Sequence, residues 1–267
     1  MEYKEILQAL WKQYHATHPI VRKVYELIAT KEKVIVNDHI ALRTCNHPSI
    51  NMDHLAQPFL QSGYVQSGSY DFPRKKLKAH HYEHTTDKDA PKIFISELLM
   101  EEFSNDLQNI LLGSIEKIPT DILTTPELLW QGCLWKHISY KTYQKLRQES
   151  EYAAWWYVYG FCANHFTISL NHLSHFTSLP MLCVFLKEHG IELNETGGII
   201  KGTPEQLLEQ ASTVAGELFV EFSDGVYDIP GSYYEFAKRY QNKKGELYQG
   251  FIAASADKIF ESTNFRK

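Results

Sequence analysis

The chain has 267 residues and a formal net charge of −5 at neutral pH, with 43% hydrophobic and 22% charged residues, as in a globular protein with a substantial core. The acidic balance gives no basic surface for nucleic acid or an anionic membrane, and no apolar run approaches the ~20 residues of a transmembrane helix. We therefore expect a cytoplasmic protein with neither nucleic acid nor membrane as a partner. The four widely spaced cysteines include no CxxC pair, which predicts reduced thiols.

The predicted elements occur in an order that repeats. In residues 1–32, apolar side chains recur at three- and four-residue spacing, which predicts N-terminal helices. Residues 33–100 show the pattern β-α-β-β-β, residues 101–160 show helical patterns, and residues 161–240 show β-α-β-β-β again. A C-terminal segment, 241–267, follows. We expect one α+β domain across the whole chain, 1–267, in which a helical insert joins two βαβββ modules.

The opening strand of each module carries a histidine on its less apolar face. In "NDHIALRT", His39, Ala41 and Arg43 share one face, because alternate side chains of a strand point the same way. In "NHFTISLN", a polar face begins with His165, and the opposite face is apolar. If the two modules pack edge to edge, these strands bring His39 and His165 together. The alternative is that the polar face of the second strand lies in solvent.

A third donor is found in "GSYYEFAKR". Glu235 lies between aromatic residues, where an unpaired carboxylate is costly to bury and therefore needs a partner. Two imidazoles and one carboxylate, with coordination positions left open, suit non-haem Fe(II) and oxygen chemistry. The alternative for Glu235 is an ion pair with Lys238 or Arg239 on an exposed helix start, and the sequence alone favours neither interpretation.

Arg43 shares its strand face with His39. A guanidinium next to a metal site is a bidentate fork for a substrate carboxylate, whereas the alternative is an ion pair with an acidic residue. Glu97 is a possible fourth ligand or a partner of a ligand, although a charge at a strand end is the favoured interpretation. We expect His172 and His175 to lie in a turn. The other histidines are expected on the surface or at an interface; they include His15, His18, His80, His81 and His84.

Four motifs carry a resemblance to a known family. "NDHIALRT", "NHFTISLN", "GSYYEFAKR" and "GFIAASADKIFESTN", in this order over roughly residues 39–264, resemble the 2-oxoadipate dioxygenase/decarboxylase family. That family has the vicinal-oxygen-chelate fold of paired βαβββ modules, as in glyoxalase and the extradiol dioxygenases. The resemblance implies a curved mixed sheet around a metal site. It agrees with the element order predicted from the residues.

The resemblance also implies a chemistry. The family depends on Fe(II), and His39, His165 and Glu235 match its metal ligands, so both histidines border the substrate. Arg43 matches the arginine that holds the substrate's carboxylate and is therefore the implied catalytic and substrate-binding residue. The implied reaction converts 2-oxoadipate and O2 to 2-hydroxyglutarate and CO2, a step of lysine catabolism.

Two other functions fit the same residues. A glyoxalase-like metal-dependent isomerase or hydrolase would use the three ligands without O2, and a non-catalytic module of this fold would bind a small molecule without metal. The chain is also shorter than well-understood family members between Glu235 and the C-terminal motif, a region that helps close the pocket in them. The identity of the 2-oxo acid therefore stays open. The tail is expected to supply pocket wall near Ser255.

Overall fold

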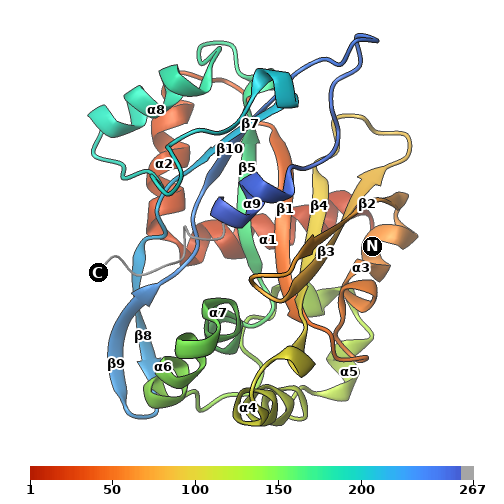
Figure 1. Ribbon diagram of the computed structural model, residues 1–267, viewed down its shortest axis with the longest axis vertical. Helices are drawn as coiled ribbons and strands as arrows, with labels where there is room; N and C mark the ends of the chain where they lie inside the picture. Colours follow the sequence, from red (N-terminus) through yellow and green to blue (C-terminus); the bar gives the residue numbers. More distant parts are fainter. Residues whose placement is uncertain (260–267) are drawn as a thin grey trace.

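The computed structural model describes residues 1–259, which build a curved eight-stranded mixed sheet (Figure 1). The strand order is β2-β3-β4-β1-β5-β10-β7-β6. The first four strands in the chain are β1 (Asn37–Cys45), β2 (Tyr64–Phe72), β3 (Leu77–His84) and β4 (Lys92–Leu98). The others are β5 (Ala163–Ser169), β6 (Lys201–Thr203), β7 (Leu208–Ser212) and β10 (Glu235–Arg239).

The sheet consists of two related halves, as the sequence predicts. One half is β1-α3-β2-β3-β4 and the other is β5-α8-β6-β7-β10, with α3 at Met52–Gln61 and α8 at Leu179–Glu188. In each half the first strand pairs parallel with the last, and β1 pairs antiparallel with β5 at the seam. The register there is symmetric about the pair Ile40–Phe166, so a pseudo-twofold axis relates the two halves.

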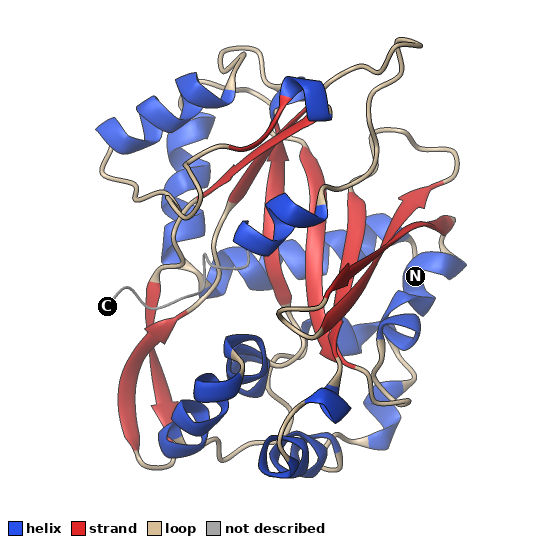
Figure 2. Ribbon diagram, viewed as in Figure 1, coloured by secondary structure: helices blue, strands red, loops and turns tan. Residues whose placement is uncertain are grey.

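One hairpin departs from the predicted order. Strands β8 (Glu217–Phe222) and β9 (Gly225–Pro230) pair only with each other and form a separate two-stranded sheet, which Figure 2 shows beyond the edge of the main sheet. The pattern of residues 161–240 predicts a continuous βαβββ module, whereas this hairpin interrupts it and pairs with no strand of the module. The sequence of residues 191–204 predicts a strand with a Gly-Gly turn at Gly197 and Gly198, but only Lys201–Thr203 form a strand, β6. The second module therefore takes β6, β7 and β10 as its three later strands.

The N-terminal helices cover the convex face of the sheet. In α1 (Tyr3–Thr17) the buried side chains recur at helical spacing, and α2 (Pro19–Ala29) begins with proline at its first position, where no backbone N–H is needed. The rings of Trp11 and Tyr14 lie 5.1 and 5.0 Å from that of Phe166, on the apolar face of β5. Because the helices bury this face, the histidine-bearing faces of β1 and β5 point into the concave side.

Residues 101–160 form helices at one end of the sheet, as expected, and short 3₁₀ turns connect elements here and elsewhere (Figure 1). The helices are α4 (Asn105–Ile115), α5 (Thr120–Leu123), α6 (Tyr140–Glu149) and α7 (Glu151–Tyr159), and the 3₁₀ turns are η1 (Met100–Glu102), η2 (Pro126–Trp130), η3 (Leu170–His172) and η4 (Pro204–Gln206). Nearly every side chain of α7 is buried, so this helix packs between the sheet and the rest of the insert. It ends at Gly160, whose positive φ and close approach to Gly132 leave no room for a Cβ.

The C-terminal segment closes the concave side. After β10 the chain turns back through a bridge between Gln241 and Leu247, and residues 248–251, here called the strap, lead into α9 (Ala253–Ile259). This helix contacts β2 of one module and β6 and β7 of the other. In Figure 1 it lies in front of the central strands, opposite α1. The end of the C-terminal motif, 260–264, lies outside the described residues. No helix within 1–259 has the length and apolarity needed to cross a membrane.

Candidate metal centre

His39, His165 and Glu235 meet on the concave side of the sheet. They come from the adjacent strands β1, β5 and β10, and one donor atom of each lies within 4.8 Å of the others. The Nε2 atoms of the two histidines are 3.4 Å apart, and the Glu235 carboxylate oxygens lie 3.2 Å from His165 Nε2 and 3.6 Å from His39 Nε2. All three side chains are buried, so the solvent-facing alternative for His165 is wrong.

The residue before each histidine orients its imidazole. His39 Nδ1 donates to Asp38 Oδ1 at 2.8 Å, and His165 Nδ1 donates to Asn164 Oδ1 at 3.0 Å. With the proton fixed on Nδ1, the lone pair of each Nε2 points into the site, which is the arrangement that a metal ion requires. Glu235 is oriented in the same way, because its Oε1 accepts a hydrogen bond of 2.6 Å from the Gln210 amide.

The electrostatics of the cluster favour replacement of a proton by a cation. Burial raises the pKa of Glu235 to about 8, and burial lowers the pKa values of His39 and His165. The site therefore holds neutral imidazoles and a carboxyl group that keeps its proton at neutral pH. A divalent cation would release this proton, because metal ligands must be deprotonated. Imidazole nitrogen and carboxylate oxygen suit iron, cobalt, nickel and zinc, so the donor set fits a transition metal.

Phe94 occupies the place of a fourth donor. In the second module, Glu235 of β10 lies opposite Thr167 of β5. In the first module, Phe94 of β4 lies opposite Ala41 of β1, which is the equivalent of Thr167. The pseudo-twofold axis that relates the histidines thus relates Glu235 to Phe94. Because a phenyl ring cannot coordinate metal, the site offers three donors, and an apolar side chain takes the fourth equivalent position.

Glu97 lies on the opposite face of the sheet from the three candidate ligands. It follows Ser96 on β4, and Ser96 faces the cavity, so alternation turns Glu97 to the other face of the sheet. Its Oε2 accepts the backbone N–H of Met52 at 3.0 Å and thereby caps the start of α3. Glu97 does lie near the end of β4, as the strand-end interpretation predicts, but its side chain is buried and caps α3.

Arg43 lies in the same cavity as the three donors. Its guanidinium carbon is 4.9 Å from the ring centre of Tyr152 and 5.0 Å from that of Trp155, both on α7. These rings hold the planar cation by cation–π contact without using its in-plane donor directions. The cavity lies on the concave side of the sheet, between the strands and the C-terminal segment. Its wall also includes Ala41, Ser96, Tyr233, Phe251, Ala256 and Ile259.

Comparison with known proteins places the chain in a family. The family model described as 2-oxoadipate dioxygenase/decarboxylase matches residues 2–247. The chain belongs to this family. A chloroplastic 2-oxoadipate dioxygenase/decarboxylase of Arabidopsis thaliana is 35% identical over 98% of this chain and 77% of its own length.

Two solved structures extend this result. The hydroxyglutarate synthase of Oryza sativa, crystallised with 2-oxoadipate, superimposes with a TM-score of 0.91 at 34% identity, covering 98% of this chain and 91% of that one. A protein of Shewanella frigidimarina, described as a hydrolase, has a TM-score of 0.88 at 44% identity, covering 94% and 97%. This fold is therefore shared with both proteins over nearly the whole chain.

The structure adds residues that sequence reasoning missed. Asp38 and Asn164 orient the histidines, Gln210 orients Glu235, and Arg239 pairs with Asp38 at 2.7 Å and not with Glu235. The alternative of an exposed helix start at Glu235 is wrong, since β10 pairs with β5 on one side and β7 on the other. The sequence contained a signal for two of these residues, because Asp38 directly precedes His39 and Asn164 directly precedes His165.

The other histidines lie outside the cluster. His172 ends the 3₁₀ turn after β5 and His175 follows in a loop, as expected. His18 and His81 were expected on the surface or at an interface, but both are buried. His81 lies on the concave side, where its Nδ1 is 2.9 Å from the Tyr70 hydroxyl and its Nε2 is 3.0 Å from Glu83. Both ring nitrogens of His81 thus have partners outside the candidate metal centre.

Proposed function

We propose that the protein is an Fe(II)-dependent dioxygenase and decarboxylase that converts 2-oxoadipate and O2 to 2-hydroxyglutarate and CO2. The observation that carries this proposal is one cavity holding two imidazoles, one carboxylate and a buried guanidinium: His39, His165, Glu235 and Arg43. Membership of the family and its structural likeness to the rice hydroxyglutarate synthase support the choice of substrate. We propose cytoplasmic lysine catabolism as the setting.

The proposed reaction conserves all atoms of both substrates. The C1 carboxylate of the six-carbon 2-oxo acid leaves as CO2, the keto carbon becomes a new carboxylate, and the neighbouring carbon gains a hydroxyl group. One oxygen atom of O2 enters each of the last two groups. A divalent iron held by His39, His165 and Glu235 would polarise the keto group and supply the electron chemistry that O2 requires.

The chain's own residues position the substrate. Arg43 would bind one carboxylate of the dicarboxylate with two parallel hydrogen bonds, and its contact with Tyr152 and Trp155 fixes the direction of that fork. Phe94, Phe251 and Ile259 form an apolar wall that excludes water from the reacting end. Glu235 would lose its proton when the metal binds, and Gln210 would keep the resulting carboxylate in place.

The test begins with metal-free protein reconstituted with Fe(II) under nitrogen. On addition of 2-oxoadipate and O2, it should consume O2 and release CO2 in equal amounts. Absence of turnover with any 2-oxo acid would refute the proposal. Activity with Zn(II) or Ni(II) under nitrogen would instead support an isomerase or hydrolase. A protein whose stability does not respond to Fe(II), Co(II) or Zn(II) would support a metal-free binding module, because a bound ion stabilises the folded state.

A further inference from the structure

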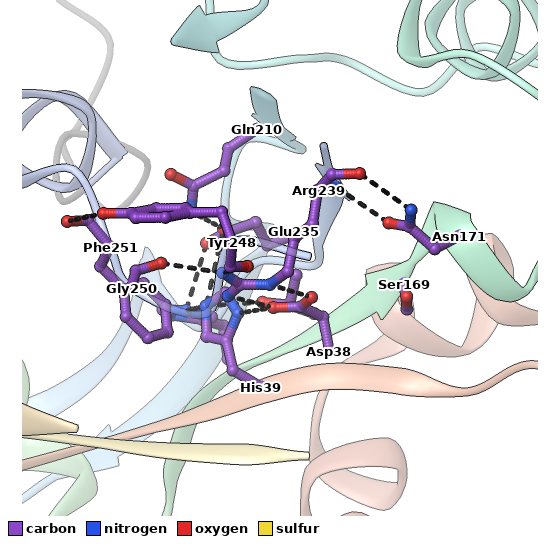
Figure 3. Close-up of polar contacts among 12 residues, drawn as sticks. Asp38, His39, Ser169, Asn171, Gln210, Glu235, Arg239, Tyr248, Gly250 and Phe251 are labelled. Atoms are coloured by element: carbon purple, nitrogen blue, oxygen red, sulfur yellow. Dashed lines mark hydrogen bonds and ion pairs between the residues drawn. The ribbon is translucent and has the colours of Figure 1, made fainter. Parts of the chain in front are cut away.

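Arg239 connects β1 to the strap. Its Nε and Nη2 donate to the two carboxylate oxygens of Asp38 at 2.7 and 2.9 Å. Its Nη1 donates to the backbone carbonyls of Tyr248 and Gly250 at 3.0 and 2.8 Å (Figure 3). Both charged side chains are almost completely buried. A single guanidinium thus divides its donors between an ion pair and the backbone of the strap.

The strap continues directly over the candidate metal ligand. The Phe251 ring meets His39 edge-on with 4.8 Å between ring centres, and the Phe251 backbone N–H donates to the Tyr70 hydroxyl at 3.0 Å. Phe251 also lines the cavity. The ring that covers the site therefore follows directly on the residues that Arg239 holds.

The second module provides an internal comparison. Asn164 is the equivalent of Asp38, and its amide oxygen orients His165 as the Asp38 carboxylate orients His39. Within the described residues, the amide nitrogen of Asn164 has no hydrogen-bond partner. A neutral oxygen is thus sufficient to orient a histidine in this fold. The charge and the second oxygen of Asp38 serve Arg239.

We propose that Arg239 is a positioning residue that, with Asp38, anchors the strap over the cavity. Both hydrogen bonds from Arg239 to the strap come from Nη1, and the Phe251 ring lies over the guanidinium, with 5.2 Å between Cζ and the ring centre. The strap can therefore lift while Nε and Nη2 stay on Asp38 and His39 stays oriented. Access to the cavity is then separated from the geometry of the metal ligand. The part of this inference that concerns His39 as a ligand rests on the proposed function, whereas the anchoring of the strap does not.

The test compares the double substitution Asp38→Asn/Arg239→Met with Asp38→Ala and Asn164→Ala. The double variant removes both buried charges together and gives His39 the amide partner that His165 has. Two measurements are made on metal-free protein: hydrogen exchange of the strap amides, and titration with Co(II) followed by its visible absorption.

In the double variant, strap amides should exchange about tenfold faster or more, because charge-assisted hydrogen bonds to the strap are lost. Its Co(II) affinity should stay close to that of the wild type. In Asp38→Ala and Asn164→Ala, Co(II) affinity should fall by roughly 10–100-fold, the usual effect of removing a partner of a ligating histidine. Strap exchange should be unchanged in Asn164→Ala.

Unchanged strap exchange in the double variant would overturn the proposal. A loss of Co(II) affinity as large as in Asp38→Ala would also overturn it, because the charge of Asp38 would then serve His39. If the wild type does not bind Co(II), the proposed function fails, and strap exchange still decides the role of Arg239. Arg239→Lys is a second variant that keeps a counterion for Asp38; it should give intermediate strap exchange, since one ammonium cannot serve both partners.

Discussion

Phe94 and Glu235 occupy equivalent positions in the two modules, one on β4 and the other on β10. The symmetry of the backbone therefore offers four donor positions, and the side chains fill three. If this arrangement defines the open side of the site, Phe94→Glu should add a fourth donor. We expect metal affinity to rise by about tenfold or more, because affinity follows the number of charged ligands, and 2-oxoadipate turnover to be lost.

Competition with a chelator measures that affinity. Phe94→Leu is the matched control, since it keeps the apolar wall and should leave metal affinity unchanged. A Phe94→Glu protein that folds and binds metal no more tightly than the wild type would show that the pseudo-twofold relation does not extend to the ligand atoms.

The three donors should each be required for metal to stabilise the fold. At an ion concentration 100 times the Kd, the wild type should gain about 2.7 kcal/mol in its free energy of unfolding. His39→Ala, His165→Ala and Glu235→Ala should gain almost nothing, as measured by thermal unfolding with and without Co(II). His81→Gln changes another buried histidine of the concave side and should keep the full gain. A response retained in Glu235→Ala would exclude it as a ligand.

Arg43→Lys should keep metal binding and lose substrate affinity. A lysine cannot form the bidentate pair, and hydrogen bonds to charged groups contribute about 1.5–3 kcal/mol, so the Kd for 2-oxoadipate should rise roughly 10–100-fold. Calorimetry with Zn(II)-loaded protein under nitrogen measures this step without turnover. The same titration with 2-oxohexanoate, which lacks the distant carboxylate, identifies the group that Arg43 binds. Equal 2-oxoadipate affinity in both proteins would contradict the role.

His18 should make the fold sensitive to acid. It is buried at the start of α2, with Nδ1 3.0 Å from the Tyr14 carbonyl, and burial lowers its pKa to about 4. In the unfolded chain the imidazole has a pKa near 6.5, so between these values the unfolded state binds the extra proton. Stability contributed by this group is complete above pH ~6.5 and is lost as pH falls toward 4, by roughly 3 kcal/mol.

Urea unfolding at pH 7 and pH 4.5 measures that loss. His18→Gln removes the titrating group, so its stability should fall by clearly less over the same interval. An equal fall in the two proteins would assign the acid sensitivity to other groups.

Sequence periodicity predicted the faces of the strands well and the partners of the side chains poorly. The two-residue repeat placed His39 and Arg43 together, since it depends only on local backbone geometry. The pairing of Asp38 with Arg239 depends on the relative positions of β1, β5 and β10, which tertiary packing sets between residues 201 positions apart. The strand conformation at Glu235 was hard to predict for the same reason. The charges of "YYEFAKR" also fit a helix, but the pairing of β10 with β5 and β7 makes this segment a strand.

The seam between β1 and β5 has a consequence for assembly. The candidate ligands His39 and His165 come from opposite sides of this seam, and the chain that links the two modules passes through the helical insert. A bound ion would thus join two halves that each carry an incomplete site. Two fragments produced by cutting the chain between α4 and α5 should therefore associate more tightly when a divalent metal is present, so that the ion acts as a cross-link between half-proteins.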